Sequence, residues 1–560
     1  MRSQAALSET PDLYGAFPRL SDQQLALLAE HGERRRTRTD EVLFREGDRS
    51  YDFFVVLEGT VAIVDGYGGD PRLIAVHGAG RFLGELSLLT GETAFFTAVV
   101  RERGEVLRLT VEQLKDIVMR DQALGDMILR AYIVRREILI GLGAGLRIVG
   151  SRYSPDTRRL REFAARNRLP HRWIDLEEDP AVEALLRSLG VSPDETPVVI
   201  WRGSHVLRNP SNTELAGLVG LRSPAAEQLV ADLVVVGAGP AGLAAAVYGA
   251  SEGLRTVALD AVATGGQAGT SSRIENYLGF PAGISGAELA ERATIQARKF
   301  GAAITVPAEA EGLTQEDGVY AIRVAGESEI RAQAVVIATG ARYRRLPVDR
   351  REEFEGTSIY YAATPMEANQ CRGDPVAVVG GGNSAGQAAL FLAEHTPVVR
   401  MIVRENELGE NMSRYLIDRI ERAPNIEVLL HTEVRELIGH HGKLEALEVE
   451  DIRTATRGRI EARSLFVFIG AEPHTGWLRD ELVLDERGFV VTGQGAAPSG
   501  GNGGPGGAPH RPQLLESSRP GVFAVGDVRS GSVKRVASAV GEGSMSVRLV
   551  HEYLASRPTG

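Results

Sequence analysis

Residues 232–242, DLVVVGAGPAG, decide the fold of the C-terminal half of this chain. The apolar run predicts a buried strand, and the glycines after it have the G-x-G-x-x-G spacing that opens an alanine-rich helix. Gly237 permits a tight turn, Gly239 lets the backbone approach a pyrophosphate, and Gly242 lets the helix pack closely on the strand. Because a helix N-terminus presents free amides and a positive dipole end, this turn predicts a dinucleotide-binding domain.

An acidic residue strengthens this prediction. Asp260 ends the next predicted strand, residues 256–259, where a carboxylate can accept hydrogen bonds from ribose hydroxyls. The alternative, a glycine-rich turn that serves packing alone, does not require the second strand or the acid. The predicted turn residues are Gly237, Gly239, Pro240, Ala241 and Gly242.

A second glycine motif lies further along the chain. Residues 374–385, DPVAVVGGGNSA, repeat the strand, turn and helix pattern, with Ala385 in the third small position. The sequence therefore predicts two Rossmann-like, three-layer α/β dinucleotide-binding domains.

Composition limits the other possibilities. A chain of 560 residues is too long for one hydrophobic core, and its net charge of −11 with no long basic run argues against a nucleic-acid partner. No window offers about 18 uncharged apolar residues, and the N-terminus lacks a signal-peptide pattern. We expect a soluble, cytoplasmic protein without a membrane partner.

The cysteine count excludes much redox chemistry. Cys371 is the single cysteine, so the chain can form no intrachain disulfide, no CxxC redox centre and no cysteine-based zinc site. We predict no metal site.

Pattern changes along the chain predict four regions. Residues 18–140 have short alternating strands, including 52–57 and 60–64, and then a helical stretch, which predicts a β-roll. Residues 146–222 predict a small α/β domain with strands at 146–150, 172–175 and 197–201 and helices at 156–167 and 180–189. The two dinucleotide domains take residues 229–348 with 465–560, and residues 349–464. Residues 492–512 are glycine-rich and predict a disordered surface loop.

Five motifs between residues 232 and 553 resemble those of low-molecular-weight thioredoxin reductases. They are the first glycine turn, GGQ at 265–267 with IENYLGFP at 274–281, ATG at 338–340, GVFAVGD at 521–527, and KRVA at 534–537. The resemblance implies FAD as the cofactor of the first domain. Beyond the turn, it implies FAD contacts from Asp260, Gly265, Gln267, Asn276, Ala338, Thr339, Gly340, Gly526, Asp527, Arg535, Val536 and Ala537.

The resemblance makes the second domain the site of a nicotinamide coenzyme. It implies contacts from Gly380, Gly382, Asn383, Ser384, Ala385 and Arg404. It also implies NADPH, because relatives place two basic residues after the following strand. Here Glu405 takes the second place and would repel a 2′-phosphate, although Arg414 could compensate, so NADH stays open.

The resemblance also shows what this chain lacks. Ala362 and Pro365 stand where thioredoxin reductases carry the CxxC, and neither can form the thiolate that attacks a disulfide. Residues 146–222 resemble a glutaredoxin or thioredoxin, with Thr196 and Pro197 as its cis-proline signature, yet SPDT at 154–157 replaces the cysteine motif. Cys371 has no partner, and we expect a small, semi-buried residue there.

The N-terminal region resembles a cyclic nucleotide-binding domain. GELSL at residues 84–88 matches the start of its phosphate-binding cassette, in which the glutamate holds the ribose. The cassette arginine is missing, because TAFFTA occupies residues 93–98 and the next arginine is Arg101. Without that charge-assisted bond to phosphate, a degenerate interaction domain is favoured over cyclic nucleotide binding.

These features predict an FAD-dependent NAD(P)H oxidoreductase that passes electrons to an external acceptor. Ferredoxin–NADP reductases of the same fold also lack the CxxC, so a thioredoxin-like protein, ferredoxin, a quinone and oxygen all stay open. We hypothesise that Tyr360 and Tyr361 cover the flavin face that the cysteines would occupy, or that the acceptor enters there. The alternatives are thioredoxin-disulfide reduction without a CxxC and a non-catalytic redox or nucleotide-responsive sensor. The resemblance also implies a homodimer.

Overall fold

The computed structural model describes residues 8–66, 71–178, 182, 186–187, 189–201, 205–222, 230–271, 273–326, 329–355, 357–363, 365–410, 412–497 and 511–557. The chain divides into two compact units, residues 1–226 with 298–307, and residues 227–297 with 308–560. Residues 298–307 fall inside the predicted range 229–348 but group with the first unit.

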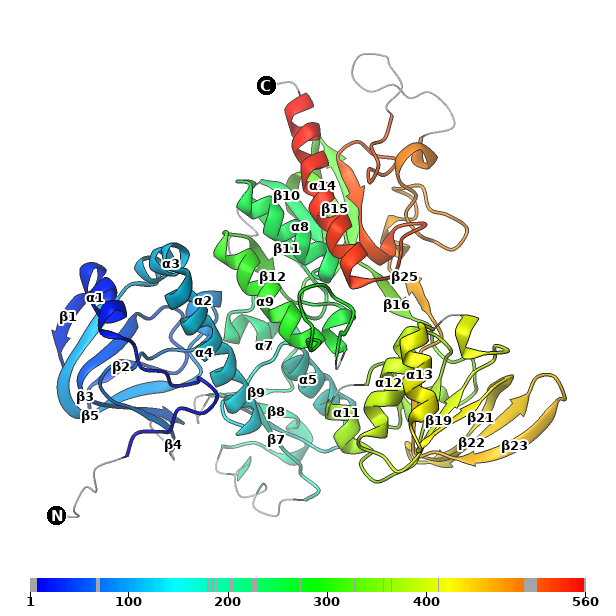
Figure 1. Cartoon of the computed structure of the whole chain (residues 1–560), viewed down its shortest axis with the longest axis horizontal. Coiled ribbons are helices and arrows are strands. Elements are labelled where there is room, and N and C mark those ends of the chain that lie inside the picture. The colour runs from blue at the N-terminus through cyan, green and yellow to red at the C-terminus, as the bar shows by residue number, and fades with distance from the viewer. Residues whose placement is uncertain are drawn as a thin grey trace. The chain divides into compact units, whose positions relative to one another are not determined.

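The first unit begins with an antiparallel β-roll whose sheet has the order β1-β5-β3-β4, with β2 beside β5 (Figure 1). Its strands are β1 (Glu33–Arg36), β2 (Val42–Phe44), β3 (Phe53–Asp65), β4 (Arg72–His77) and β5 (Thr97–Leu109). Its helices are α1 (Asp22–His31), α2 (Ser87–Thr90), α3 (Val111–Arg120) and α4 (Gln122–Gly141).

The prediction of two strands at 52–57 and 60–64 was wrong, because β3 runs through both. The register between β3 and β5 shifts on either side of Gly59. Gly59 has φ +87°, and a Cβ there would lie 2.4 Å from the carbonyl oxygen of Glu102. A bulge therefore occupies the position where the sequence suggested a turn.

The first unit continues with a second sheet in the order β7-β6-β8-β9. Its strands are β6 (Leu146–Val149), β7 (His171–Ile174), β8 (Val198–Trp201) and β9 (His205–Arg208), and its helices are α5 (Pro155–Arg166), η1 (Pro193–Glu195) and α7 (Asn212–Val219). The predicted strands and the helix at 156–167 are present, whereas β9 and α7 were not predicted. The helix predicted at 180–189 lies largely outside the described residues. The Thr196–Pro197 peptide bond is cis. Unit 1 also contains β12 (Ala303–Thr305).

The second unit contains two α/β lobes. The outer lobe is built on the strand order β11-β10-β15-β14-β13, with β26 beside β15. Its strands are β10 (Ala231–Val236), β11 (Thr256–Leu259), β13 (Ala310–Glu316), β14 (Val319–Val324), β15 (Ile330–Ile337) and β26 (Val522–Ala524). Its helical elements are α8 (Pro240–Ser251), η3 (Ala268–Thr270), α9 (Gly286–Lys299), η5 (Gly476–Leu478), η6 (Gly493–Ala496), η7 (Gly526–Val528) and α14 (Val536–Ser556). Of the loop predicted at 492–512, residues 498–510 lie outside the described part.

The inserted lobe has a parallel sheet in the order β17-β24-β18-β19-β20. Its strands are β17 (Ile359–Tyr360), β18 (Val376–Val379), β19 (Val399–Ile402), β20 (Ile426–Leu429) and β24 (Ser464–Val467), and its helices are α10 (Arg351–Phe354), α11 (Pro365–Gln370), α12 (Asn383–Ala393), η4 (Leu408–Glu410) and α13 (Arg414–Arg422). Strands β16 (Ala341–Tyr343) and β25 (Ala471–Pro473) pair with each other between the two lobes in the sequence.

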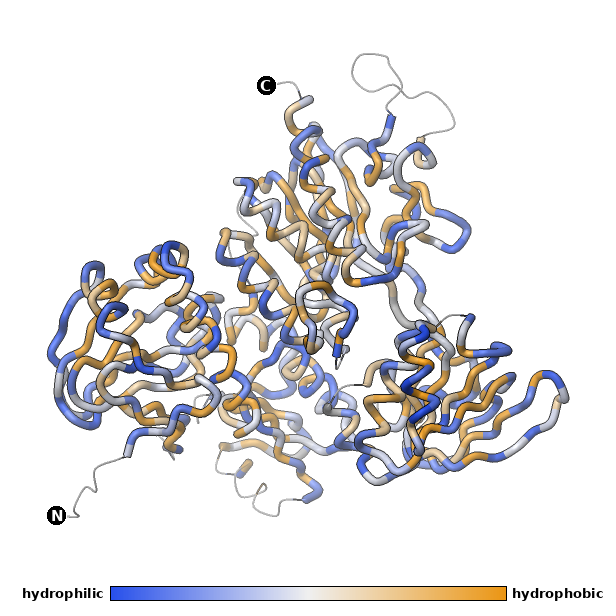
Figure 2. Tube along the Cα trace, viewed as in Figure 1, coloured by the Kyte–Doolittle hydropathy of each residue, from blue (hydrophilic) through white to orange (hydrophobic). Residues whose placement is uncertain are grey.

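Apolar residues concentrate along the strands of both lobes and on the inner faces of their helices, as Figure 2 shows. In the inserted lobe the sheet is buried on both sides. One cluster joins β18 and β19 to α12 and α13, and the other joins the same strands to the hairpin of β21 (Thr432–His440) and β22 (Lys443–Asp451). A sheet buried on both faces accounts for the continuous apolar runs of these strands.

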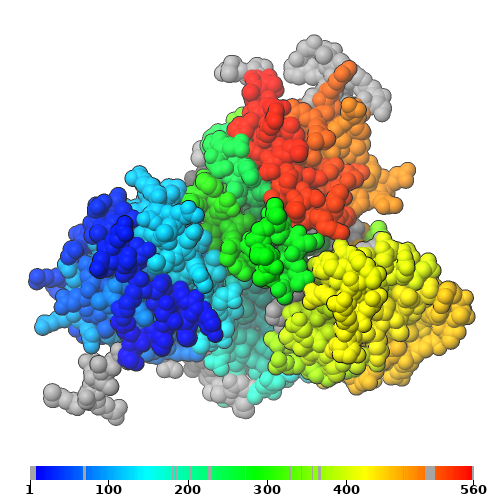
Figure 3. Space-filling view, in the orientation of Figure 1, coloured from blue at the N-terminus to red at the C-terminus, as the bar shows by residue number. Residues whose placement is uncertain are grey.

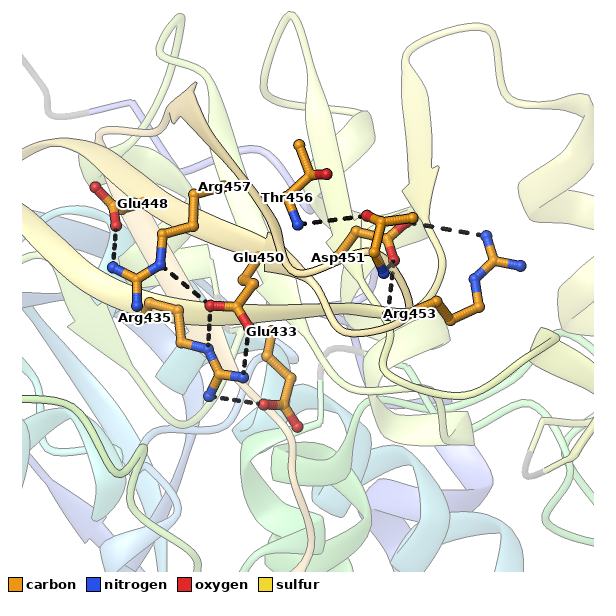
Figure 4. A network of polar contacts seen from close by, with 9 residues as sticks. Glu433, Arg435, Glu448, Glu450, Asp451, Arg453, Thr456 and Arg457 are labelled. Carbon is orange, nitrogen blue, oxygen red and sulfur yellow. Dashed lines mark hydrogen bonds and ion pairs between the residues drawn. The ribbon is translucent and has the colours of Figure 1, made fainter.

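An antiparallel sheet of β21 (Thr432–His440), β22 (Lys443–Asp451) and β23 (Thr456–Glu461) extends the inserted lobe. Its residues and those of α13 are yellow and gold in the space-filling view (Figure 3). Its outer surface carries alternating charges: Glu450 pairs with Arg435 at 3.3 Å and with Arg457 at 3.1 Å (Figure 4). Because solvent screens exposed ion pairs, this network contributes little to folding stability.

No helix among the described residues is long and apolar enough to cross a membrane. Within the same part of the chain, no group of three or more His, Cys, Asp or Glu side chains could hold a metal ion.

Candidate functional site

Four segments meet at one edge of the outer lobe. Strands β10, β11, β15 and β26 run parallel, so their carboxyl ends lie together. The residues that follow these ends are Gly237, Asp260, residues 338–340 and residues 526–527. Ligands of open α/β sheets bind in the crevice outside this edge. The structure therefore brings together the predicted turn, acid and two of the later motifs.

The first glycine turn has the geometry that the motif predicts. Gly237 has φ +106°, and a Cβ there would lie 2.3 Å from the carbonyl oxygen of Ala338. A Cβ on Gly242 would lie 1.7 Å from the carbonyl oxygen of Gly237. At Gly239, in contrast, the nearest atom to such a Cβ would be Cα of Gly266 at 3.9 Å. Gly237 and Gly242 are thus required for packing, while space is left in front of Gly239.

Gly239 is the N-cap of α8, and Pro240 and Ala241 begin the helix. No side chain caps this end, so its first amides point outward without an intrahelical partner. Such a helix end is suited to an anionic ligand because its amides and dipole both favour negative charge.

Asp260 lies at the end of β11, where it was predicted, but its carboxylate is used by the protein itself. One carboxylate oxygen accepts the Ala238 N–H at 2.8 Å, and the other accepts those of Val262 and Ala263 at 3.0 and 3.1 Å. The short aspartate side chain therefore fixes the turn. Any ribose contact would use the lone pairs that remain.

Residues 265–267 form a second loop beside the turn. The Gly265 N–H donates to the carbonyl oxygen of Ala238 at 2.7 Å, and the Gln267 side-chain amide donates to the carbonyl oxygen of Ala341. Gly266 belongs to the motif but is not among the predicted site residues, although a Cβ there would lie 3.1 Å from Cα of Gly239. The two consecutive glycines, Gly265 and Gly266, could have indicated this close approach. Asn276 is exposed in the following segment.

The motif at residues 338–340 follows β15. Ala338 packs under the first turn, as the contact with Gly237 shows. The Thr339 hydroxyl donates to the carbonyl oxygen of His474 at 3.0 Å, and Gly340 has φ +63°. These residues join the sheet edge to the segment that enters the inserted lobe.

Asp527, one of the implied FAD contacts, lies in the loop that follows β26 at this edge. Its carboxylate makes no hydrogen bond with any residue that the structure describes, although the side chain is only partly exposed. Burial raises the pKa of Asp527, an effect that nearby Lys534 opposes. A partly buried carboxylate without a donor can accept hydrogen bonds from a ligand's hydroxyl groups.

The C-terminal helix completes the edge. Arg535 is the N-cap of α14, and Val536 and Ala537 begin it. A Cβ on Gly543 would lie 2.1 Å from the carbonyl oxygen of Ala241, so α14 packs against α8 with very close backbones. Gly543 was not predicted, although a glycine inside an otherwise helical segment can indicate such a close contact.

Glu542 was also missed. Its carboxylate accepts the Gly526 N–H at 2.7 Å and pairs with Arg529. Gly526 lies against the first turn, since a Cβ there would be 2.9 Å from Cβ of Ala241. Glu542 therefore positions the loop that carries Asp527.

The inserted lobe repeats the glycine turn. Gly380 has φ +134°, and a Cβ there would lie 2.4 Å from the carbonyl oxygen of Phe468, as for Gly237 in the outer lobe. Gly382 is the N-cap of α12 and lacks a side-chain cap. The Asn383 side chain accepts the Ser413 N–H at 2.7 Å, Ser384 is exposed and Ala385 is buried. The predicted cradle residues are thus together at one helix end.

Two charged residues follow β19. Arg404 extends into solvent with its side chain 72% exposed, whereas that of Glu405 is 20% exposed. A Cβ on Gly381 would lie 3.1 Å from a carboxylate oxygen of Glu405. The acid, and not the predicted arginine, therefore lies over the glycine turn.

The positions of the missing cysteines lie in a short segment between β17 and α11. Ala362 is partly buried, and Pro365 is the first residue of α11. The Tyr360 hydroxyl donates to the carbonyl oxygen of Thr357 at 2.7 Å, and that of Tyr361 donates to Glu355 at 2.6 Å. Both rings pack on apolar clusters of the inserted lobe. Their proposed position over a flavin stays a prediction.

Cys371 is more buried than predicted, at 1% exposure. Burial raises the pKa of its thiol to about 11. In the second sheet of the first unit, the Ser154 hydroxyl accepts the Thr157 N–H at 3.2 Å and caps α5. Neither place provides a reactive thiolate.

The cassette of the β-roll is closed by the chain itself. Glu85 is 4% exposed, and one carboxylate oxygen accepts the Phe95 N–H at 2.6 Å while the other has no hydrogen-bond partner among the described residues. Phe95 and Phe96 lie in one buried cluster with Trp201, Leu146 and other residues of the second sheet. The Phe95 and Trp201 rings meet edge to face, with centroids 5.4 Å apart.

Comparison with known proteins agrees with this architecture. Residues 231–543 match the pyridine nucleotide-disulphide oxidoreductase family, and residues 34–121 match the cyclic nucleotide-binding domain. NADPH-dependent thioredoxin reductase 3 of Arabidopsis thaliana is 30% identical over 370 residues, which are 63% of this chain and 66% of that protein. This chain therefore spans just under two thirds of the plant protein.

Two further similarities cover nearly the whole of the other protein. The 34.2 kDa protein in the rubredoxin operon of Clostridium pasteurianum is 30% identical over 332 residues, which are 59% of this chain and 99% of that protein. The crystal structure of T. acidophilum thioredoxin reductase has a TM-score of 0.52 and 30% identity, and it covers 58% of this chain and 99% of its own.

The family model spans more than half of the chain and contains both glycine turns. Thioredoxin reductase-like members of this family depend on FAD and NADPH. The chain belongs to the pyridine nucleotide-disulphide oxidoreductase family as a thioredoxin reductase-like enzyme, with a cyclic nucleotide-binding domain ahead of the family domain.

Proposed function

We propose that this chain is an FAD-dependent NAD(P)H oxidoreductase that passes electrons to an acceptor outside the chain. The observation that carries the proposal is the sheet edge of the outer lobe, where the space before Gly239 and the carboxylate of Asp527 lie on parallel strand ends. FAD fits both features, because it offers a pyrophosphate to the helix end and hydroxyl groups to the acid. When bound, it accepts a hydride from a nicotinamide and delivers the electrons onward.

In this proposal the protein's own residues bind and orient. The amides at the start of α8 would hold the flavin phosphates, Asp527 would accept hydrogen bonds from the ribityl hydroxyls, and the backbone at the start of α14 would contact the flavin. In the inserted lobe, the helix end at Gly382 holds the coenzyme phosphates. Residues 229–348 with 465–560 would then form the FAD domain, and residues 349–464 the NAD(P)H domain.

The acceptor must be external because the chain cannot form a redox-active disulfide. Its single thiol is buried with a raised pKa, and its two CxxC-like positions carry no cysteine. No side chain of this chain could therefore relay electrons as a thiol pair, and the acceptor would be a quinone, ferredoxin, oxygen or a foreign disulfide.

Anaerobic rapid mixing tests this function. The purified, FAD-loaded protein should lose its visible flavin absorbance when NADH or NADPH is added, as expected of a flavin that accepts a hydride. Reoxidation by each acceptor class then ranks the candidates. A flavin that stays oxidised with both coenzymes would contradict the proposal and support the sensor alternative. Fast turnover in a thioredoxin-coupled assay would favour the disulfide reductase alternative.

The burial of the cassette favours a second role, for the first unit. We propose that the β-roll is an interaction domain whose cassette docks on residues 146–222, which themselves adopt a thioredoxin-like fold without cysteines. Phe95 packs against residues 146–222, the phosphate-binding arginine is absent, and Glu85 is bonded to the backbone. Calorimetric titration with cyclic AMP and cyclic GMP should give no heat of binding. Micromolar affinity for either would overturn this role.

A further inference from the structure

We propose that Glu405 makes this chain selective for NADH over NADPH. This inference rests on the proposed function, which leaves the two coenzymes open, and it concerns the adenosine ribose of the coenzyme in the inserted lobe. It uses only contacts within that lobe.

The position of Glu405 follows from the fold. In a Rossmann-like domain the adenosine ribose lies between the glycine turn and the end of the second strand. Here the second strand is β19, and Glu405 follows it. The carboxylate lies against Gly381 of the glycine turn, 3.1 Å from where a Cβ would be. The 2′-hydroxyl or the 2′-phosphate of a bound coenzyme would therefore lie next to this carboxylate.

The charge at this place distinguishes the two coenzymes. A carboxylate accepts hydrogen bonds from the 2′- and 3′-hydroxyls of NADH, whereas it repels the 2′-phosphate of NADPH. The side chain of Glu405 is only 20% exposed, so solvent screens this repulsion less than on an open surface.

The nearby basic residues are poorly placed to offset the repulsion. Arg404 is 72% exposed and its nearest acid is Glu405 itself, at 3.3 Å. Arg414 pairs with Asp418 at 2.8 Å and lies 3.9 Å from Glu421. His431, whose N–H donates to the carbonyl oxygen of Glu405, lies in the electrostatic field of Asp451. The loop after Glu405 adds two more exposed acids, Glu407 and Glu410.

Equilibrium binding tests the inference without relying on turnover. The FAD-loaded protein is titrated with NAD⁺ and with NADP⁺ in a calorimeter, and 5′-AMP and 2′,5′-ADP serve as probes of the ribose site alone. We expect NAD⁺ to bind at least tenfold more tightly, which is about 1.4 kcal/mol. The rates of flavin reduction by NADH and NADPH should show the same preference.

Two variants that change the net charge equally show whether coenzyme selectivity depends on the position of the carboxylate or only on the net charge. Glu405→Gln should weaken NAD⁺ binding at least tenfold and strengthen NADP⁺ binding, so the ratio of the two affinities collapses. Glu407→Gln is the matched control and should leave that ratio within about twofold, because its carboxylate is solvated. Unchanged thermal melting of both variants excludes a folding defect.

The outcomes are distinct. Tighter binding of NADP⁺ by the wild-type protein, or a ratio that Glu405→Gln does not change, would overturn this inference and leave the proposed function intact. Failure of an FAD-loaded protein to bind either dinucleotide would overturn both.

Discussion

The glycine turn of the outer lobe and the cassette of the β-roll both match nucleotide-binding motifs, but they differ in the space that they leave for a ligand. At the turn, the backbone leaves space before Gly239, and at the same edge Asp527 offers a carboxylate that makes no hydrogen bond within the described part of the chain. In the cassette, Phe95 is buried against the second sheet and the acid Glu85 bonds to the backbone. A matching sequence motif therefore specifies the local fold, whereas the space around it decides its capacity for a ligand.

The largest expected effect would come from opening the closed site. Phe95→Ala removes a fully buried ring from the shared cluster and leaves a cavity, so the first unit should lose about 3–5 kcal/mol of unfolding free energy. Denaturant unfolding measures this loss. Tyr153→Ala, at an exposed aromatic residue, is the control and should change stability by less than about 0.5 kcal/mol. A small effect at Phe95 would mean that the cassette is not closed.

The next effect would come from closing the open site. Gly239→Ala should fold, because the added Cβ would meet no atom nearer than 3.9 Å, yet it enters the space assigned to the pyrophosphate. FAD affinity should fall about 100-fold, or about 2.7 kcal/mol, as measured by flavin fluorescence on titration of apoprotein. Gly541→Ala on α14, where a Cβ also meets nothing within 4 Å, should retain FAD. Normal FAD binding by Gly239→Ala would refute the site.

Glu85 gives a pH-dependent test of the closed site. Burial raises the pKa of Glu85 to about 7, while Arg136 opposes the shift. Between its usual pKa and 7 the folded state keeps a proton that the unfolded state releases, so stability falls as pH rises through this window. Glu85→Gln removes this dependence. The free energy of unfolding of Glu85→Gln minus that of wild type should rise by about 2 kcal/mol from pH 5 to pH 8, as measured by urea unfolding at each pH. Parallel pH profiles would contradict the prediction.

Asp527 gives a milder test of the open site. Asp527→Asn retains the shape of the side chain but weakens its acceptor strength and introduces donors, so FAD affinity should fall about tenfold. The exposed Asp480→Asn is the matched control and should bind FAD as wild type does. Equal affinities for the two variants would remove Asp527 from the site.

The smallest effect belongs to the single cysteine. Because burial raises its thiol pKa to about 11, Cys371 should react with iodoacetamide at pH 8 at least about tenfold more slowly than free cysteine. Cys371→Ala should alter the rate of flavin reduction by less than about twofold. A marked loss of activity would reveal a redox role that the geometry does not support.

Local motifs predicted what short-range backbone geometry determines. Gly237 and Gly380 have the conformations that their motifs require, and the parallel strands bring the FAD-motif segments to one edge. The hydrogen bonds from Asp260 to the backbone of its own turn were not predicted, because they depend on a side chain that is one methylene shorter than that of glutamate. The burial of Phe95 against Trp201 was also missed, since these residues come from different sheets and no periodicity links them.

The close packing of Gly543 on Ala241 has a consequence for the order of synthesis. The first turn is made early in the family domain, but its last supports, β26 and the start of α14, follow the entire inserted lobe in the sequence. A growing chain on the ribosome therefore has the phosphate-binding loop long before it has Asp527. Cofactor loading should wait until α14 (Val536–Ser556) has emerged, so flavin content should report that both halves of the outer lobe have been made and have packed together.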